Sequence, residues 1–238
     1  MKKILFFFLL CLALNSSAQT ISRSNLHKVE SYRWDAYLAL HDTYYGNVTY
    51  KEGSGVTISR LTLSDGKYNM RVSNYGNIND FGIASERGAT EGPAFWRGLA
   101  LQISEYGPSY ASKGLFTQGA TSKNNKVSQV YEFKAKDPQA FLNAFKTFLN
   151  ENKEAIKDRW VNLSQFTVAN LNGASHSVTI AGENWSELER LRHALETNVK
   201  SYQKFLQDRG EVVDTRNYLV ERVRHYNNTR IKEGTTRD

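Results

Sequence analysis

The stretch KVSQVYEFKA, residues 126–135, decides the fold, because it opens the most regular pattern in the chain. Val127, Tyr131 and Phe133 fall on one side of an alternating pattern, which predicts a β-strand. Asp137 and Pro138 follow. This pair is typical of a helix start, since Asp caps the free N–H groups and Pro fits the first turn. The stretch therefore predicts a strand that leads directly into a helix.

The residues that follow continue in the same manner. An apolar stripe at helical spacing runs through Phe141, Ala144, Phe145, Phe148 and Leu149. The further elements expected are a helix to about residue 157, strands 160–169 and 175–182 joined by an Asn172-Gly173 turn, a helix from the capping box of Ser186 and Glu189 to Gly210, and a strand 218–226. This strand–helix–strand–strand–helix–strand order is that of the ferredoxin-like unit.

The N-terminal half has a weaker form of the same pattern. The elements expected there are a strand 25–34, a helix 35–45, a hairpin of strands 55–63 and 68–73 around Asp65-Gly66, a helical segment opening at residues 79–81, a helix between 95 and 106, and a short edge strand 114–118. Residues 77–81 parallel residues 184–188, because each run holds an Asn, an apolar residue, a capping residue, an acid and an apolar residue. Duplication of one unit therefore accounts for both halves, and chance similarity is the alternative.

The first 18 residues have the composition of a cleavable signal peptide. Two lysines precede an apolar run from Ile4 to Leu14, and the small residues Ser16 and Ala18 stand where a signal peptidase cuts. The mature chain is therefore expected to begin at Gln19 and to be periplasmic or extracellular. An uncleaved anchor is the alternative. Cys11 is the only cysteine, so the mature chain is expected to lack disulfides and thiolate sites.

The arrangement resembles the dimeric α/β-barrel superfamily in a tandem form. The resemblance rests on the strand and helix order of residues 126–226 and its partial echo in residues 25–118. It implies an α+β protein of two ferredoxin-like units, residues 19–119 and 126–230, packed sheet to sheet as a barrel within one chain, with residues 119–125 as the tether. Members of the superfamily include cofactor-free monooxygenases, haem-handling enzymes and stress-response proteins. Because no motif matches residue by residue, none of their functional residues is carried over.

Charge and motifs exclude several function classes. The formal charge of +7 includes two lysines of the signal peptide, and no basic helix or aromatic RNA-binding motif is present, so we expect no nucleic-acid partner. The five histidines form no metal-binding spacing, which leaves a zinc site without support. The chain also contains no phosphate-binding glycine loop and no nucleophile elbow. No later segment is long and apolar enough to span a membrane.

A ligand site is expected between the two sheets. The aromatic content of 12% is unusual, and tyrosine and tryptophan suit surfaces with one apolar and one wet side. The candidate ligand-binding residues are His176, Tyr131 and Trp160. His176 lines the site only if its side of the strand faces inward; a hydrogen-bonded structural histidine is the alternative.

The sequence supports three functions without deciding among them. The first is an exported module that binds a small apolar or aromatic ligand, or a protein partner, in or beside the barrel. The second is an enzyme of the cofactor-free monooxygenase-like or haem-dependent kind. The third is a structural or stress-associated envelope protein. The catalytic residues, the cofactor and the oligomeric state are left open.

Overall fold

The protein is described here as a computed structural model that covers residues 19–64, 66–119, 124–157, 159–168 and 171–228. The proposed signal peptide lies outside these residues, as do Asp65 and most of the tether. The elements of the first half are β1 (Thr20–Lys28), η1 (Ser31–Arg33), α2 (Trp34–Tyr45), β2 (Gly55–Thr62), β3 (Met70–Asn77), α3 (Glu91–Ala100) and β4 (Glu105–Gln118). Those of the second half are β5 (Val127–Ala135), α4 (Pro138–Glu151), α5 (Lys153–Ile156), β6 (Val161–Val168), η2 (Leu171–Gly173), β7 (His176–Gly182), α6 (Trp185–Thr197), α7 (Val199–Asp208) and β8 (Val212–Asn227).

The eight strands form one closed antiparallel barrel in the order β1-β3-β2-β8-β5-β7-β6-β4. Within it, the first half contributes the run β4-β1-β3-β2 and the second half the equivalent run β8-β5-β7-β6. Pairing of β2 with β8 and of β4 with β6 joins the two runs at both edges. The predicted α+β barrel within one chain is confirmed. Closure also leaves no strand edge unpaired within the barrel.

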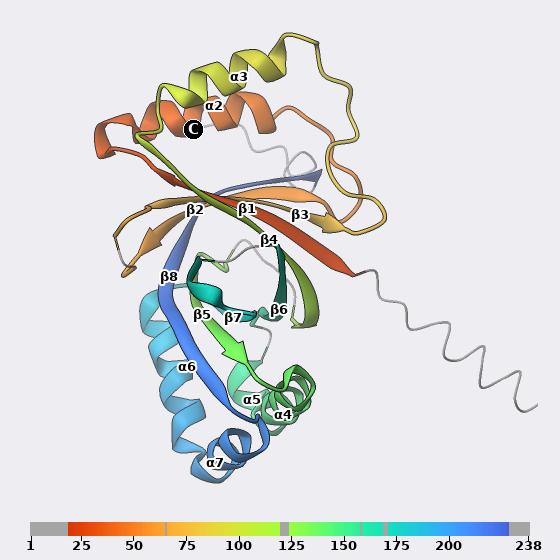
Figure 1. Ribbon diagram of the computed structural model, residues 1–238, viewed down its shortest axis with the longest axis vertical. Coiled ribbons are helices and arrows are strands. Elements are labelled where there is room, and N and C mark those ends of the chain that lie inside the picture. Colours follow the sequence, from red (N-terminus) through yellow and green to blue (C-terminus); the bar gives the residue numbers. More distant parts are fainter. Residues whose placement is uncertain (1–18, 65, 120–123, 158, 169–170, 229–238) are drawn as a thin grey trace, which may run out of the picture.

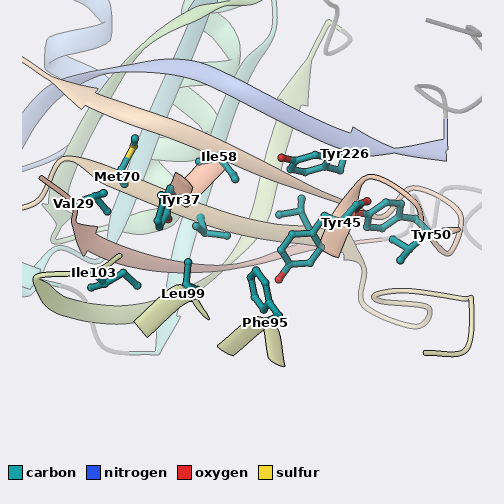
Figure 2. Packing of buried hydrophobic residues seen from close by; sticks show 13 residues of the cluster. Val29, Tyr37, Tyr45, Tyr50, Ile58, Met70, Phe95, Leu99, Ile103 and Tyr226 are labelled. Carbon is teal, nitrogen blue, oxygen red and sulfur yellow. Dashed lines mark hydrogen bonds between the residues drawn. The ribbon is translucent and has the colours of Figure 1, made fainter. Parts of the chain in front are cut away.

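The helices cover the outside of the barrel, with α2 and α3 over the first half and α4 to α7 over the second (Figure 1). Beneath α2 and α3 lies an aromatic core that includes Tyr37, Tyr45 and Phe95 (Figure 2). The matching core of the second half is richer in phenylalanine and leucine, with Phe141, Phe145 and Leu163 among its members. Each strand therefore buries its apolar side against helices and turns its other side into the barrel.

The second half follows the sequence pattern closely. The side chain of Asp137 accepts hydrogen bonds from the backbone N–H groups of Gln139 and Ala140, as expected for the cap of α4. The cap of α6 differs, because Asn184, and not Ser186, accepts the capping bond. The long helix expected to reach Gly210 is broken at Asn198 into α6 and α7. The last strand begins at Val212, earlier than expected.

The first half departs further from expectation. The strand expected at 114–118 is the end of β4, which has 14 residues and pairs with both β1 and β6. Residues 79–81 form no helix, and α3 begins before residue 95, at Glu91. The first strand begins at Thr20 and ends at Lys28, not at residue 34. Among the described residues, no helix has the length and apolar character needed to cross a membrane.

Candidate functional site

The barrel encloses a cavity of about 370 Å³, lined by side chains from all eight strands. A volume of this size lies within the range of roughly 300–1,000 Å³ seen for small-molecule sites. Gly53, Asn125 and Trp160 line the cavity from the connections that precede β2, β5 and β6, so they lie together at one end of the barrel. At the opposite end, Leu26, Leu61 and Tyr68 belong to an apolar cluster. The cavity therefore has one open end and one closed end.

Serine and threonine are the most frequent residues of the cavity wall. They occupy inward positions of the strands, alternating with the apolar residues that face the helices. The set comprises Thr20, Ser22, Ser24, Thr57, Ser59, Ser73, Ser112, Thr117, Ser128, Ser164, Ser177 and Thr179. The wall is thus rich in groups that both donate and accept hydrogen bonds.

Three side chains form a charged network deep in the cavity. The hydroxyl of Tyr218 donates to Oε1 of Glu132 over 2.8 Å, and Nη1 of Arg71 donates to the Tyr218 hydroxyl oxygen over 3.4 Å. Burial raises the pKa of Tyr218 well above its ordinary value, and neighbouring Tyr110 adds to the effect, so the phenol stays protonated. Within the described part of the chain, Nε of Arg71 is buried and has no hydrogen-bond partner. The network thus presents a fixed cation with a spare donor.

A second polar group lies nearer the open end. Arg222, Tyr75 and His225 all line the cavity there, and the Tyr75 hydroxyl is hydrogen-bonded to Nε2 of His225. Burial raises the pKa of Tyr75 and lowers that of Arg222, but a guanidinium still carries its charge at neutral pH. Gly55 is required beside this group, because a Cβ there would lie 2.4 Å from the Tyr75 hydroxyl oxygen.

The two groups give the cavity an excess of positive charge. Of the described residues that line it, Arg71 and Arg222 carry positive charge and Glu132 alone carries a carboxylate. Charge interactions are stronger in such an enclosed space than in bulk water. The wall can therefore attract an anion through the arginines and orient it through the hydroxyls.

Only one of the three sequence candidates reaches the cavity. Trp160 lines its open end. Tyr131 lies on the opposite face of β5 and packs against the phenylalanine-rich core under α4 to α7. His176 also faces outward, so the condition for its lining the site is not met. The three residues are not brought together, and binding by any of them stays a prediction.

His176 has the surroundings of a structural residue. It is 2% exposed, its Nδ1 is hydrogen-bonded to the Ser175 hydroxyl over 2.7 Å, and its ring stacks on Phe133. Burial lowers its pKa, which favours the neutral imidazole. Because the cavity does not extend to this ring, His176 is not placed to ligate a group bound there.

A buried cluster of histidine and tyrosine side chains lies on the outer face of the first half. Nδ1 of His27 is hydrogen-bonded to the Tyr37 hydroxyl over 2.8 Å, and Nδ1 of His41 donates to the Tyr37 carbonyl oxygen over 2.8 Å. Burial lowers the pKa of both histidines to about 4. The described residues contain no group of three metal-binding side chains, here or elsewhere. Because the pKa values of His27 and His41 lie near 4, both imidazoles are neutral at physiological pH.

Sequence reasoning missed the charged cavity residues Arg71, Glu132 and Arg222. Each lies inside a strand whose other side is apolar, as Glu132 does between Tyr131 and Phe133. In an open sheet such polar positions face water, but closure of the barrel turns them inward. A charged residue that alternates with apolar residues along a strand of a closed barrel therefore predicts a cavity-lining position.

The solved structures place this architecture among known folds. A proposed monooxygenase from Lactobacillus acidophilus NCFM matches with a TM-score of 0.54 and 11% identity, over 89% of this chain and 97% of that one. A second proposed monooxygenase, from Fusobacterium nucleatum, gives 0.53 and 10%, over 90% and 96%. The chain has the dimeric α/β-barrel fold. At this identity the likeness concerns the fold alone.

Other comparisons add no family assignment. A chlorite dismutase mutant from Candidatus Nitrospira defluvii matches with a TM-score of 0.49 and 12% identity, over 89% of this chain and 93% of that one. No protein-family model matches the sequence, and no curated protein does. The cavity of this dimeric α/β barrel is therefore the main evidence about its function.

Proposed function

We propose that this chain binds a small organic anion inside its barrel. One observation supports this above all: the cavity wall holds two guanidinium groups, Arg71 and Arg222, against the single carboxylate of Glu132. The apolar ligand expected from aromatic content is replaced in this proposal. An apolar molecule would cover charges and hydroxyls without offering them hydrogen bonds, which is costly.

The unpartnered donor of Arg71 supports the same conclusion. Buried N–H groups in proteins almost always have a partner, whether protein, water or ligand, and a carboxylate or phosphate oxygen is the strongest acceptor for a guanidinium. The Nε of Arg71 lacks a partner among the described residues and belongs to a side chain of the cavity wall. Because this Nε is buried in the wall, an anion that enters the cavity supplies the acceptor after a small shift of the Arg71 side chain.

The test is calorimetric titration with paired probes. Acetate, benzoate, citrate and D-gluconate are each compared with their neutral amides. We expect at least one acid to bind, and Arg222→Gln to weaken that binding by about 10- to 100-fold through loss of a charge-assisted hydrogen bond. Arg23→Gln, at an exposed position of β1, removes the same charge from outside the cavity and should leave affinity unchanged. The proposal is wrong if no acid binds better than its amide.

The second candidate is a monooxygenase-like enzyme acting in the same cavity. It is favoured by the hydrogen-bonded pair of Tyr75 and His225, because a histidine in a cavity wall can exchange a proton with a bound substrate. Oxygen consumption in the presence of a ligand identified by titration would distinguish the two candidates. Under this alternative, His225→Asn removes turnover while the ligand still binds; under simple binding, the unmodified protein consumes no oxygen.

Export is also part of the proposal. The charged, apolar and small-residue order of residues 1–18 supports cleavage between Ala18 and Gln19. N-terminal sequencing of the protein recovered from the cell envelope or medium should begin at Gln19. Recovery of chains that retain Met1 would argue against it.

A further inference from the structure

We infer that the anion bound in the barrel is a polyhydroxylated one, of the sugar acid or sugar phosphate class. This inference rests on the proposed anion site and narrows it. Arginines alone would accept any carboxylate or phosphate of suitable size. The hydroxyl groups around the arginines indicate which class of anion fits the cavity.

Among the described residues, eight serine and threonine hydroxyls of the cavity wall form no hydrogen bond with another protein group, and five of these belong to half-buried side chains that a ligand can reach. Ser22, Thr57, Ser112, Ser128 and Thr179 come one each from β1, β2, β4, β5 and β7, and all are half-buried. Within the described residues, none of their hydroxyls forms a hydrogen bond with another protein group. They are therefore distributed around the barrel and directed into its free space.

Four other hydroxyls of the same wall are already hydrogen-bonded within the protein. Ser24 and Ser73 hydrogen-bond to each other over 2.8 Å, and Ser164 donates to Oδ1 of Asn162. The amide of Asn162 in turn donates to Thr117. Polar groups on β1, β3, β4 and β6 thus complete one another, while the five above require water or a ligand.

The distribution of these groups matches a carbohydrate better than a flat or apolar acid. A hydroxyl both donates and accepts, so a ring of protein hydroxyls complements a molecule whose own hydroxyls point in several directions. An apolar acid would leave this ring unsatisfied and pay its desolvation cost. Trp160 adds an amphipathic ring at the open end, a surface on which the C–H face of a sugar can pack.

Three probes of similar size measure separately how the charge and the hydroxyl groups of a ligand contribute to binding affinity. D-Glucuronate carries both features, cyclohexanecarboxylate carries only the charge, and D-glucose carries only the hydroxyls. We expect D-glucuronate to bind at least about tenfold more tightly than either of the others. D-Glucose 6-phosphate forms a fourth arm, and its affinity relative to D-glucuronate identifies which anionic group the arginines prefer.

Each outcome has a distinct meaning. Equal binding of D-glucuronate and cyclohexanecarboxylate overturns the present inference but leaves the anion site standing. Equal binding of D-glucuronate and D-glucose overturns both, because the charge then contributes nothing. Absence of binding by all four probes overturns the present inference, and it overturns the anion site as well if none of the acids titrated above binds better than its amide. Tight binding of either sugar anion, with weak binding of the two partial probes, supports both.

A pair of isosteric variants tests the hydroxyls directly. Thr57→Val combined with Thr179→Val removes two inward hydroxyls while preserving side-chain shape and strand preference. We expect D-glucuronate affinity to fall by about tenfold or more and cyclohexanecarboxylate affinity to stay constant or rise. Thr167→Val, at an exposed position of β6, is the matched control and should change neither. An unchanged D-glucuronate affinity in the double variant overturns the inference even if the anion site is real.

Discussion

The two faces of the barrel sheet differ in what they contribute. On the outer face, strand side chains such as Ile58 and Leu163 pack into two apolar cores. These cores lie on the side of the barrel that the helices cover (Figure 1). On the inner face, the neighbouring positions carry hydroxyls, two arginines and a carboxylate around a cavity. The difference teaches that the apolar groups that stabilise the fold and the polar groups of the proposed anion site lie on opposite sides of the same strands. The inner face can be polar because the outer face supplies the burial.

The largest expected effect concerns the buried histidines on the outer face of the first half. Burial lowers the pKa of His27 and His41 from 6.5 to about 4, so between these values the unfolded chain binds more protons than the folded chain. Stability is complete above pH 6.5 and is lost as the pH falls toward 4, by about 3 kcal/mol for each histidine. Urea unfolding at pH 7 and pH 4 measures this loss.

Matched variants assign the loss to the cluster. His41→Leu should reduce the difference in unfolding free energy between the two pH values by about 3 kcal/mol. His193→Gln, at an exposed position of α6, should leave that difference unchanged. An unaltered difference in the His41 variant would place the acid sensitivity elsewhere, for example among the carboxylates.

The next effect compares the two faces at adjacent positions of β6. Leu163 is fully buried in the outer core, whereas Ser164 faces the cavity. Leu163→Ala should cost about 2–5 kcal/mol, because it removes buried methyl groups and leaves a void. Ser164→Ala should cost less than about 1 kcal/mol, since it removes a single hydrogen bond in a wall that water can reach. Similar costs from urea unfolding at pH 7 would contradict the division of roles between the faces.

The fold of the second half could be predicted because its strands and helices keep regular periods. The first half was harder, and β4 shows why. Its sequence EYGPSYASKGLFTQ contains glycines and a proline and lacks a clear apolar alternation. At Gly107 a Cβ would lie 2.8 Å from side-chain atoms of Leu26 and Tyr68, so glycine there reflects close packing inside the barrel and not a turn. That constraint comes from tertiary structure and is invisible in local pattern.

The position of the cavity could be predicted from the sequence, but the chemical character of its lining could not. Packing of two sheets placed it between the halves, and Trp160 does line it. Alternation alone could not decide which side of β5 faces inward, because Val130 lies on one side and Tyr131 and Phe133 lie on the other. The sequence therefore left open whether Tyr131 and His176 line the cavity; in the structure their neighbours Glu132 and Ser177 do. Only barrel closure resolves that choice.

The smallest expected effect compares two buried tyrosines of β8 that face opposite ways. Tyr218, inside the barrel, donates to Oε1 of Glu132 over 2.8 Å, and Tyr226, in the outer core, donates to Oδ1 of Asp42 over 2.8 Å. The carboxylates differ in their surroundings. The side chain of Asp42 is 25% exposed and is also held by Arg224, whereas Glu132 is 3% exposed.

Replacement of each tyrosine by phenylalanine keeps the ring and removes only the hydroxyl. Tyr218→Phe should cost about 1–3 kcal/mol, because a buried carboxylate loses a charge-assisted hydrogen bond. Tyr226→Phe should cost about 1 kcal/mol less, since Asp42 retains Arg224 and access to water. Urea unfolding at pH 7 resolves a difference of this size when both variants retain the slope of the parent protein. A larger cost for Tyr226→Phe would show that the polar network inside the barrel adds little to stability and that its arginine and carboxylate are held in place by the surrounding wall alone.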